Sequence, residues 1–149
     1  MNFSIEIGPV TDLETLPALK DVYITMLPGG DFKETADQAE KLVKKGLNPI
    51  PHIPARSIEN EAQLKEYVSR CRDGGTKQVL VIGGSREPIG DFDSSIQLLE
   101  TGYFEDMKIG IAGHPEGSPD ISDSKLEKAM NDKKPYADYI VTQWLLDHQ

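Results

Sequence analysis

The chain has 149 residues, 38% hydrophobic and 28% charged, which predicts a single globular domain with a real core. Its formal net charge of −9 disfavours nucleic acid and anionic membranes as partners, because both need a positively charged surface. No segment approaches the ~20 apolar residues of a membrane helix, and the first ten residues lack the pattern of a signal peptide. One cysteine, Cys71, permits no internal disulfide, and no Cys/His spacing suits a metal. We therefore expect a cytoplasmic protein without a metal, in which Cys71 packs in the core.

Six short strand-like runs recur along the chain, with a helical pattern in each gap. The last four runs are near-continuous and apolar, which is typical of parallel strands buried on both faces. The predicted strands are Phe3–Ile7, Asp21–Met26, Asn48–Ile53, Gln78–Ile82, Lys108–Ala112 and Tyr139–Thr142. The predicted helices are a brief one behind a capping box at Thr11–Glu14, then Lys33–Lys45, Glu59–Arg72, Ser94–Glu100 and Asp123–Met130.

The spacing of these elements narrows the fold class to α/β. From the third run onward the strand centres lie about 30 residues apart, close to the period of an eight-unit (β/α) barrel. The sequence therefore predicts a single truncated barrel domain over residues 1–149, with about six parallel strands. An open doubly wound sheet is the alternative. A partial barrel would have exposed edges and an apolar interior, so we expect a homo-oligomer.

Two polar residues interrupt otherwise apolar strands. Glu6 lies inside the first run, and burial there would raise its pKa and suit it to general acid catalysis. His52 lies between two prolines at the end of the third run, where a side chain can reach a ligand. A solvated glutamate and a structural histidine are the alternative interpretations.

Three further strand ends carry residues suited to a ligand. Gly83 and Gly84 end the fourth run, where glycine lets a backbone approach a flat ring or a phosphate, although a tight turn would look the same. His114 ends the fifth run in a stiff Pro-bounded loop. Gln143 ends the sixth run with an amide that can both donate and accept hydrogen bonds. Because the C-terminal ends of barrel strands form one face, these residues would converge on one pocket.

Taken together, the segments resemble the methylenetetrahydrofolate reductase family, flavin-dependent barrels of one-carbon metabolism. The resemblance runs over nearly the whole chain and covers six of the family's eight strands. It rests on Ser4-Ile5-Glu6, Pro51-His52-Ile53, Gln78–Gly84, Ile109–Pro119 and Tyr139–Gln143 with Trp144–Asp147, in the family's order.

The resemblance implies a role for each candidate residue. Glu6 matches the general acid that helps open the folate ring, and Gln143 matches a folate-contacting amide. The flavin contacts that it implies are Thr25, His52, Ile82, Gly83, Gly84, Phe92 and His114.

The implied activity is reduction of 5,10-methylenetetrahydrofolate to 5-methyltetrahydrofolate, with FAD as cofactor, NAD(P)H as reductant and a folate-type small molecule as partner. Ser85 stands where the family usually has an aspartate, and His114 where it has a tyrosine, and strands seven and eight are absent. The resemblance therefore implies impaired activity in this chain alone. A non-catalytic flavin- or folate-binding fragment or module is the alternative, and a barrel enzyme acting on phosphosugars is a third candidate.

Overall fold

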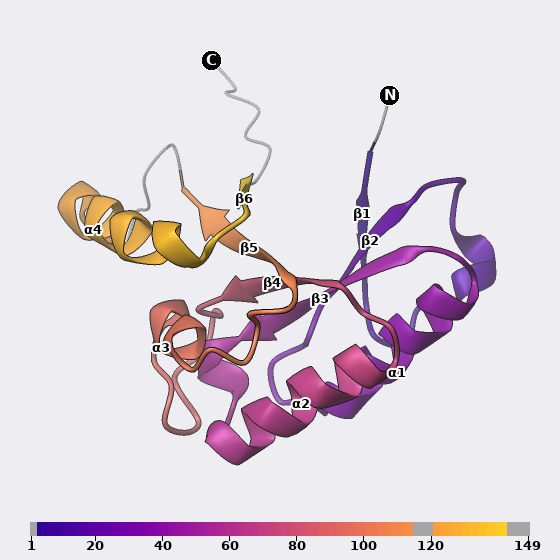
Figure 1. The fold of residues 1–149 in the computed structure, drawn as a ribbon, viewed down its shortest axis with the longest axis horizontal. Helices are drawn as coiled ribbons and strands as arrows, with labels where there is room; N and C mark the ends of the chain where they lie inside the picture. The colour runs from indigo at the N-terminus through magenta and orange to yellow at the C-terminus, as the bar shows by residue number, and fades with distance from the viewer. Residues whose placement is uncertain (1–2, 115–120, 143–149) are drawn as a thin grey trace.

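The strands form one parallel sheet whose spatial order follows the sequence, β1-β2-β3-β4-β5-β6. The computed structural model describes residues 3–114 and 121–142. Figure 1 shows the six strands curled as a half-barrel. Sequential order confirms the barrel-type prediction and excludes the doubly wound alternative, in which the order would reverse within the sheet. The strands are β1 Ile5–Ile7, β2 Asp21–Ile24, β3 Asn48–Pro54, β4 Gln78–Ile82, β5 Lys108–Gly113 and β6 Tyr139–Thr142.

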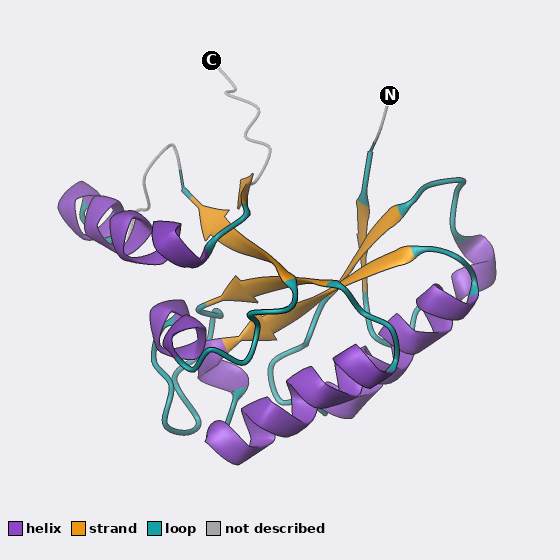
Figure 2. Cartoon of the chain, in the orientation of Figure 1, coloured by secondary structure: helices purple, strands orange, loops and turns teal. Residues whose placement is uncertain are grey.

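Helices cover one side of the sheet, which is the outer face of the half-barrel. In Figures 1 and 2, α1, α2 and α3 lie together on this side, and α4 lies beside β5 and β6. The α-helices are α1 Phe32–Lys44, α2 Glu61–Asp73, α3 Ser95–Glu100 and α4 Asp123–Lys133. Short 3-10 helices are η1 Leu13–Thr15, η2 Ala55–Ser57 and η3 Lys134–Tyr136.

The hydrophobic core lies between the sheet and these helices. Strand residues such as Val22, Ile53 and Val81 are fully buried and alternate with residues of the opposite face. Cys71 of α2 is buried in the same core, as the sequence predicts. Burial raises the pKa of its thiol to about 12, so the thiol is held in its neutral form.

Among the helix starts that differ from the predicted ones, two do so because other side chains satisfy the first amide groups. The brief helix begins after Asp12, whose side chain accepts a hydrogen bond from Glu14 N–H at 3.0 Å. Thr11 caps nothing in this helix, because its hydroxyl accepts from Gly8 N–H at 3.0 Å. Helix α2 starts at Glu61 rather than residue 59, with Asn60 as its N-cap.

The face without helices, which we call the concave face, is partly apolar, as expected from the sequence, and partly polar, which was not expected. Its residues alternate with those of the core. Asn48 Nδ2 donates to Asp21 Oδ1 at 2.9 Å and to Gln78 Oε1 at 3.0 Å, which links three adjacent strands. The members of this face on β1 to β4 are Glu6, Asp21, Tyr23, Asn48, Ile50, His52, Gln78, Leu80 and Ile82. A half-barrel is open to water, and polar side chains make that exposure tolerable.

Candidate functional site

Glu6 and His52 meet on the concave face, although 45 residues separate them in sequence. The imidazole Nε2 lies 3.6 Å from Glu6 Oε2, too long for a hydrogen bond but close enough for electrostatic attraction. Strand register produces this meeting, because Glu6 pairs with Tyr23, and Tyr23 pairs with Ile50, two residues before His52. Residues two apart on a strand share a face.

His52 is held from two sides. Its backbone carbonyl accepts a hydrogen bond from the Tyr67 hydroxyl at 2.9 Å, inside the core. Its ring packs edge-on against Tyr23, with ring centroids 6.1 Å apart. Burial lowers the pKa of His52, and the nearby Glu6 carboxylate offsets part of that shift. The imidazole is therefore biased toward its neutral form, and its buried Nε2 makes no hydrogen bond within the described residues.

Glu6 is not buried, contrary to the expectation that its position in an apolar strand suggested. Its side chain is 61% exposed. It points to the concave face rather than the core, and β1 is the first strand at one edge of the sheet. A ligand or partner would have to cover Glu6 before its carboxyl met an apolar environment.

Four more of the predicted residues lie at neighbouring strand ends. Thr25 follows β2, and its hydroxyl donates to the Ile7 carbonyl at 3.3 Å. Ile82 ends β4 beside Pro54 of β3. The carbonyl of Gly83 accepts from Arg56 N–H at 2.9 Å, and a side chain at this glycine would meet open space.

Gly84 adopts a φ of 95°, a conformation that favours glycine, beside Pro54. Gly84 therefore takes a backbone conformation that a side chain would strain, and Gly83 leaves space that a side chain would fill. The ends of β2, β3 and β4 thus bring Thr25, His52, Ile82, Gly83 and Gly84 to one region of the half-barrel.

Two of the other predicted residues do not join this group. Phe92 is buried in the core with Ile58 and Leu98, so its ring is not presented on the concave face. His114 is exposed and lines a hollow of about 510 Å³ between the ends of β5 and β6 and helix α4. Gln143 lies outside the described residues.

Sequence reasoning missed two aromatic residues of the concave face, Tyr23 and Tyr139. The signal for Tyr23 was available, because Asp21-Val22-Tyr23-Ile24 alternates polar and apolar residues, and the polar ones face away from the core. Nothing comparable marks Tyr139, which begins a short run that continues with the apolar Ile140 and Val141.

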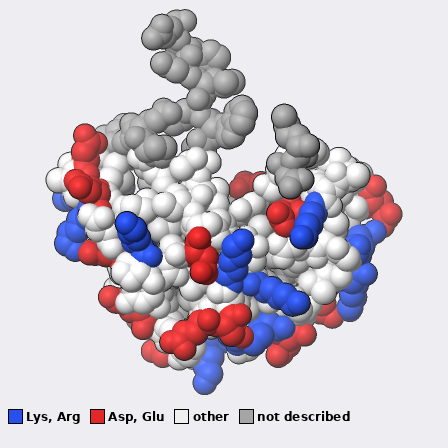
Figure 3. Space-filling model, turned by 45° about the horizontal axis from the view of Figure 1, so that its top comes forward, with Lys and Arg blue, Asp and Glu red and all other residues white. Residues whose placement is uncertain are grey.

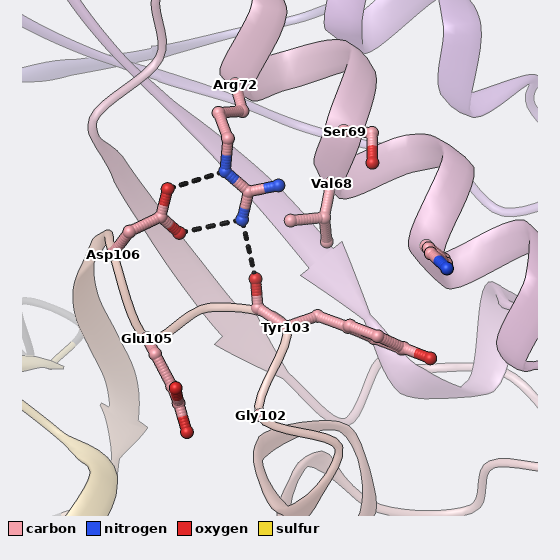
Figure 4. A pocket seen from close by; sticks show the side chains of 8 residues that line it. Val68, Ser69, Arg72, Gly102, Tyr103, Glu105 and Asp106 are labelled. Atoms are coloured by element: carbon pink, nitrogen blue, oxygen red, sulfur yellow. Dashed lines mark hydrogen bonds and ion pairs between the residues drawn. The ribbon is translucent and has the colours of Figure 1, made fainter.

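A surface hollow on the opposite side of the molecule has a structural explanation. It measures about 390 Å³ and lies between α2 and the segment before β5 (Figure 4). Arg72 makes two hydrogen bonds to Asp106, at 2.6 and 2.7 Å, and one to the Tyr103 carbonyl at 2.8 Å. The guanidinium therefore connects α2 to the segment before β5, and its hydrogen bonds serve the fold. We assign this hollow no ligand.

The surface charges of the described residues, on the face that Figure 3 shows, do not mark another site. On the face in Figure 3, acidic and basic side chains are interspersed, and neither sign forms a continuous surface. Within residues 3–114 and 121–142, no cluster of three or more His, Cys, Asp or Glu side chains could hold a metal ion. No helix in those ranges is long and apolar enough to cross a membrane.

Comparison with known proteins adds little beyond the architecture. No protein-family model matches the chain. Among solved structures, the YdjI aldolase from Escherichia coli K12 is similar at a TM-score of 0.45 and 13% identity, over 84% of this chain and 46% of that chain. The chain thus spans about half the length of that aldolase. This neighbour is not a methylenetetrahydrofolate reductase, and a likeness this weak carries no conclusion about chemistry.

Proposed function

We propose that the concave face carries part of a flavin-dependent active site of the methylenetetrahydrofolate reductase type. The supporting observation is the Glu6–His52 pair. The motif resemblance names these two residues as general acid and flavin-side histidine, and they lie 3.6 Å apart. The substrate class would be a folate-type heterocycle, with NAD(P)H as the reductant.

The residues of the chain would handle the proton and the orientation of the ligands. Glu6 would carry a proton on its carboxyl group and donate it to a ring nitrogen of the substrate, once the substrate displaces water from the site. His52, biased toward neutrality, can donate or accept at Nε2. When bound, FAD supplies hydride transfer, and the protein contributes binding and electrostatics.

Among the described residues, those at the ends of β2, β3 and β4 are placed where they could contact FAD, and another candidate, Phe92, is not. His52 Nε2 is a buried polar atom without a hydrogen-bond partner in the described residues, and Gly83 leaves open space for close approach. Thr25 and Ile82 lie at the adjacent strand ends. Phe92 would have to leave the core to reach a flavin, so we do not assign it that role. These placements support a flavin bed limited to three strands.

A second candidate is a flavin- or folate-binding module without catalysis. The exposure of the Glu6 side chain favours it, because the described residues do not shield that carboxyl from water, and a dry site is what strengthens the action of a general acid. The two candidates share the binding site and differ only in proton transfer.

An assay of product formation separates them. Protein loaded with FAD would be mixed anaerobically with NAD(P)H and methylenetetrahydrofolate, and methyltetrahydrofolate would be quantified by mass spectrometry. The enzyme proposal predicts slow formation that falls by a factor of 100 or more in Glu6→Gln, the range for loss of a general acid. Lys65→Gln on α2, on the outer face, is the matched control. Equal yields in wild type and Glu6→Gln would contradict the assignment of Glu6, and flavin binding without product would indicate the module.

A further inference from the structure

We propose that Tyr23 and Tyr139 are positioning residues for His52. Together they form a bridge across the open side of the half-barrel that excludes water from the imidazole and holds it toward Glu6. The inference deepens the proposed function, since it concerns the same site, but its geometric basis does not depend on any ligand.

Tyr139 begins the bridge from β6. Its ring passes over Gly110 of β5, where an added Cβ atom would come within 2.3 Å of Cζ and 2.6 Å of the hydroxyl oxygen. The hydroxyl donates to the carbonyl of Val79 on β4 at 3.2 Å, and the ammonium group of Lys108 lies 5.3 Å from the ring centroid. Tyr139 therefore spans three strands, and only glycine at position 110 allows it to do so.

Tyr23 continues the bridge from β2. Strand register places Tyr139, Gly110, Leu80 and His52 in one row across the concave face. Besides burial, the Tyr139 phenol is among the groups that shift the pKa of Tyr23, so side chains from the second and sixth strands approach each other across the curled sheet. Burial raises the pKa of both phenols, which are therefore neutral hydrogen-bonding groups at physiological pH. The edge of the Tyr23 ring contacts the His52 imidazole at an interplanar angle of 67°.

The groups that surround the His52 imidazole explain why it is shielded from water. Glu6 is the charged group beside its Nε2, Tyr23 is the titratable group against its ring, and Tyr67 bonds its carbonyl from α2. On β4 the register neighbour is Leu80, which has no charge. The His52 side chain is only 11% exposed, although the barrel is open on this side. The tyrosine bridge thus replaces the covering that side chains of further strands give in a closed barrel.

Titration of His52 by proton NMR tests the bridge without flavin or folate. The His52 signal would be assigned by its loss in His52→Gln. Tyr23→Leu removes the ring and should move the pKa of His52 upward, toward the ordinary value for histidine, because water reaches the imidazole. Tyr23→Phe keeps the ring and should leave His52 close to its wild-type pKa. Tyr136→Leu, at an exposed tyrosine on η3, should have no effect.

Gly110→Ala is the independent test, because it displaces Tyr139 without altering Tyr23. It should also raise the pKa of His52, with the fold checked by circular dichroism. If Tyr23→Leu does not fold, Gly110→Ala decides the proposal, and Tyr23→Phe serves as the control that keeps the ring. An unchanged His52 titration in a folded Tyr23→Leu or Gly110→Ala variant would overturn it. Since no cofactor is present, that outcome is distinct from failure of the flavin proposal.

Discussion

At the residue scale, His52 links the candidate site to the stability of the fold. Its pKa is lowered in the folded protein, so between the folded and unfolded values the unfolded chain binds more protons. Neutral His52 therefore makes its full contribution to the free energy of unfolding above the unfolded pKa of about 6.5. That contribution is lost as the pH falls from this value through the lower pKa of the folded protein. Each unit of difference between the two pKa values is worth about 1.4 kcal/mol.

Urea denaturation at pH 7.5 and pH 5.5 measures this effect. We expect the free energy of unfolding to fall more in the wild type than in His52→Gln over this interval. His114→Gln, at an exposed histidine, should behave as the wild type. A His52→Gln variant with the same pH dependence as the wild type would show that His52 is not held neutral by the fold.

At the element scale, most of the architecture could be predicted because each strand is a compact apolar run between turn residues. Strands β4 and β6 have the predicted bounds, and β3 and β5 are each one residue longer at the C-terminal end. The starts of η1 and α2 were less predictable. Several residues can cap a helix, and which one does so depends on tertiary contacts, such as the hydrogen bond from Gln38 to the Thr11 carbonyl.

The candidate site was predictable only in part, because local sequence identifies individual residues but not how distant strands pack around them. Strand ends and a polar residue within an apolar run identify Glu6 and His52 from local sequence. Their surroundings depend on which strands curl toward each other, and no local pattern reveals that Tyr139 reaches Val79. Likewise, the buried position of Phe92 follows from how the loop before α3 folds back onto the core.

At the scale of the whole molecule, the two edges of the half-barrel suggest self-association. Within the described residues, β1 and β6 each pair on one side only. Phe3 beside β1 and Ile140 on β6 are both 54% exposed. The polar side chains of the concave face weaken the apolar interior as a driving force, so we propose a homo-oligomer that forms through the strand edges.

Light scattering over a range of protein concentrations checks the assembly. We expect a mass above that of the 16.5 kDa monomer that shifts toward the monomer in Phe3→Glu or Ile140→Glu. A charge introduced at the exposed Ile89, away from both edges, is the control. A wild-type mass that remained monomeric at high concentration would contradict the proposal.

The central claim is that the strand ends around His52 bind a flavin, and titration of FAD followed by absorbance tests it most directly. We predict saturable binding that is weak in this chain alone, because the flavin bed covers only three strands and ordering must occur on binding. His52→Gln should weaken it about tenfold, the effect of losing about 1.4 kcal/mol, whereas Lys65→Gln should not. No spectral change at high FAD, or equal affinity in wild type and His52→Gln, would contradict the account.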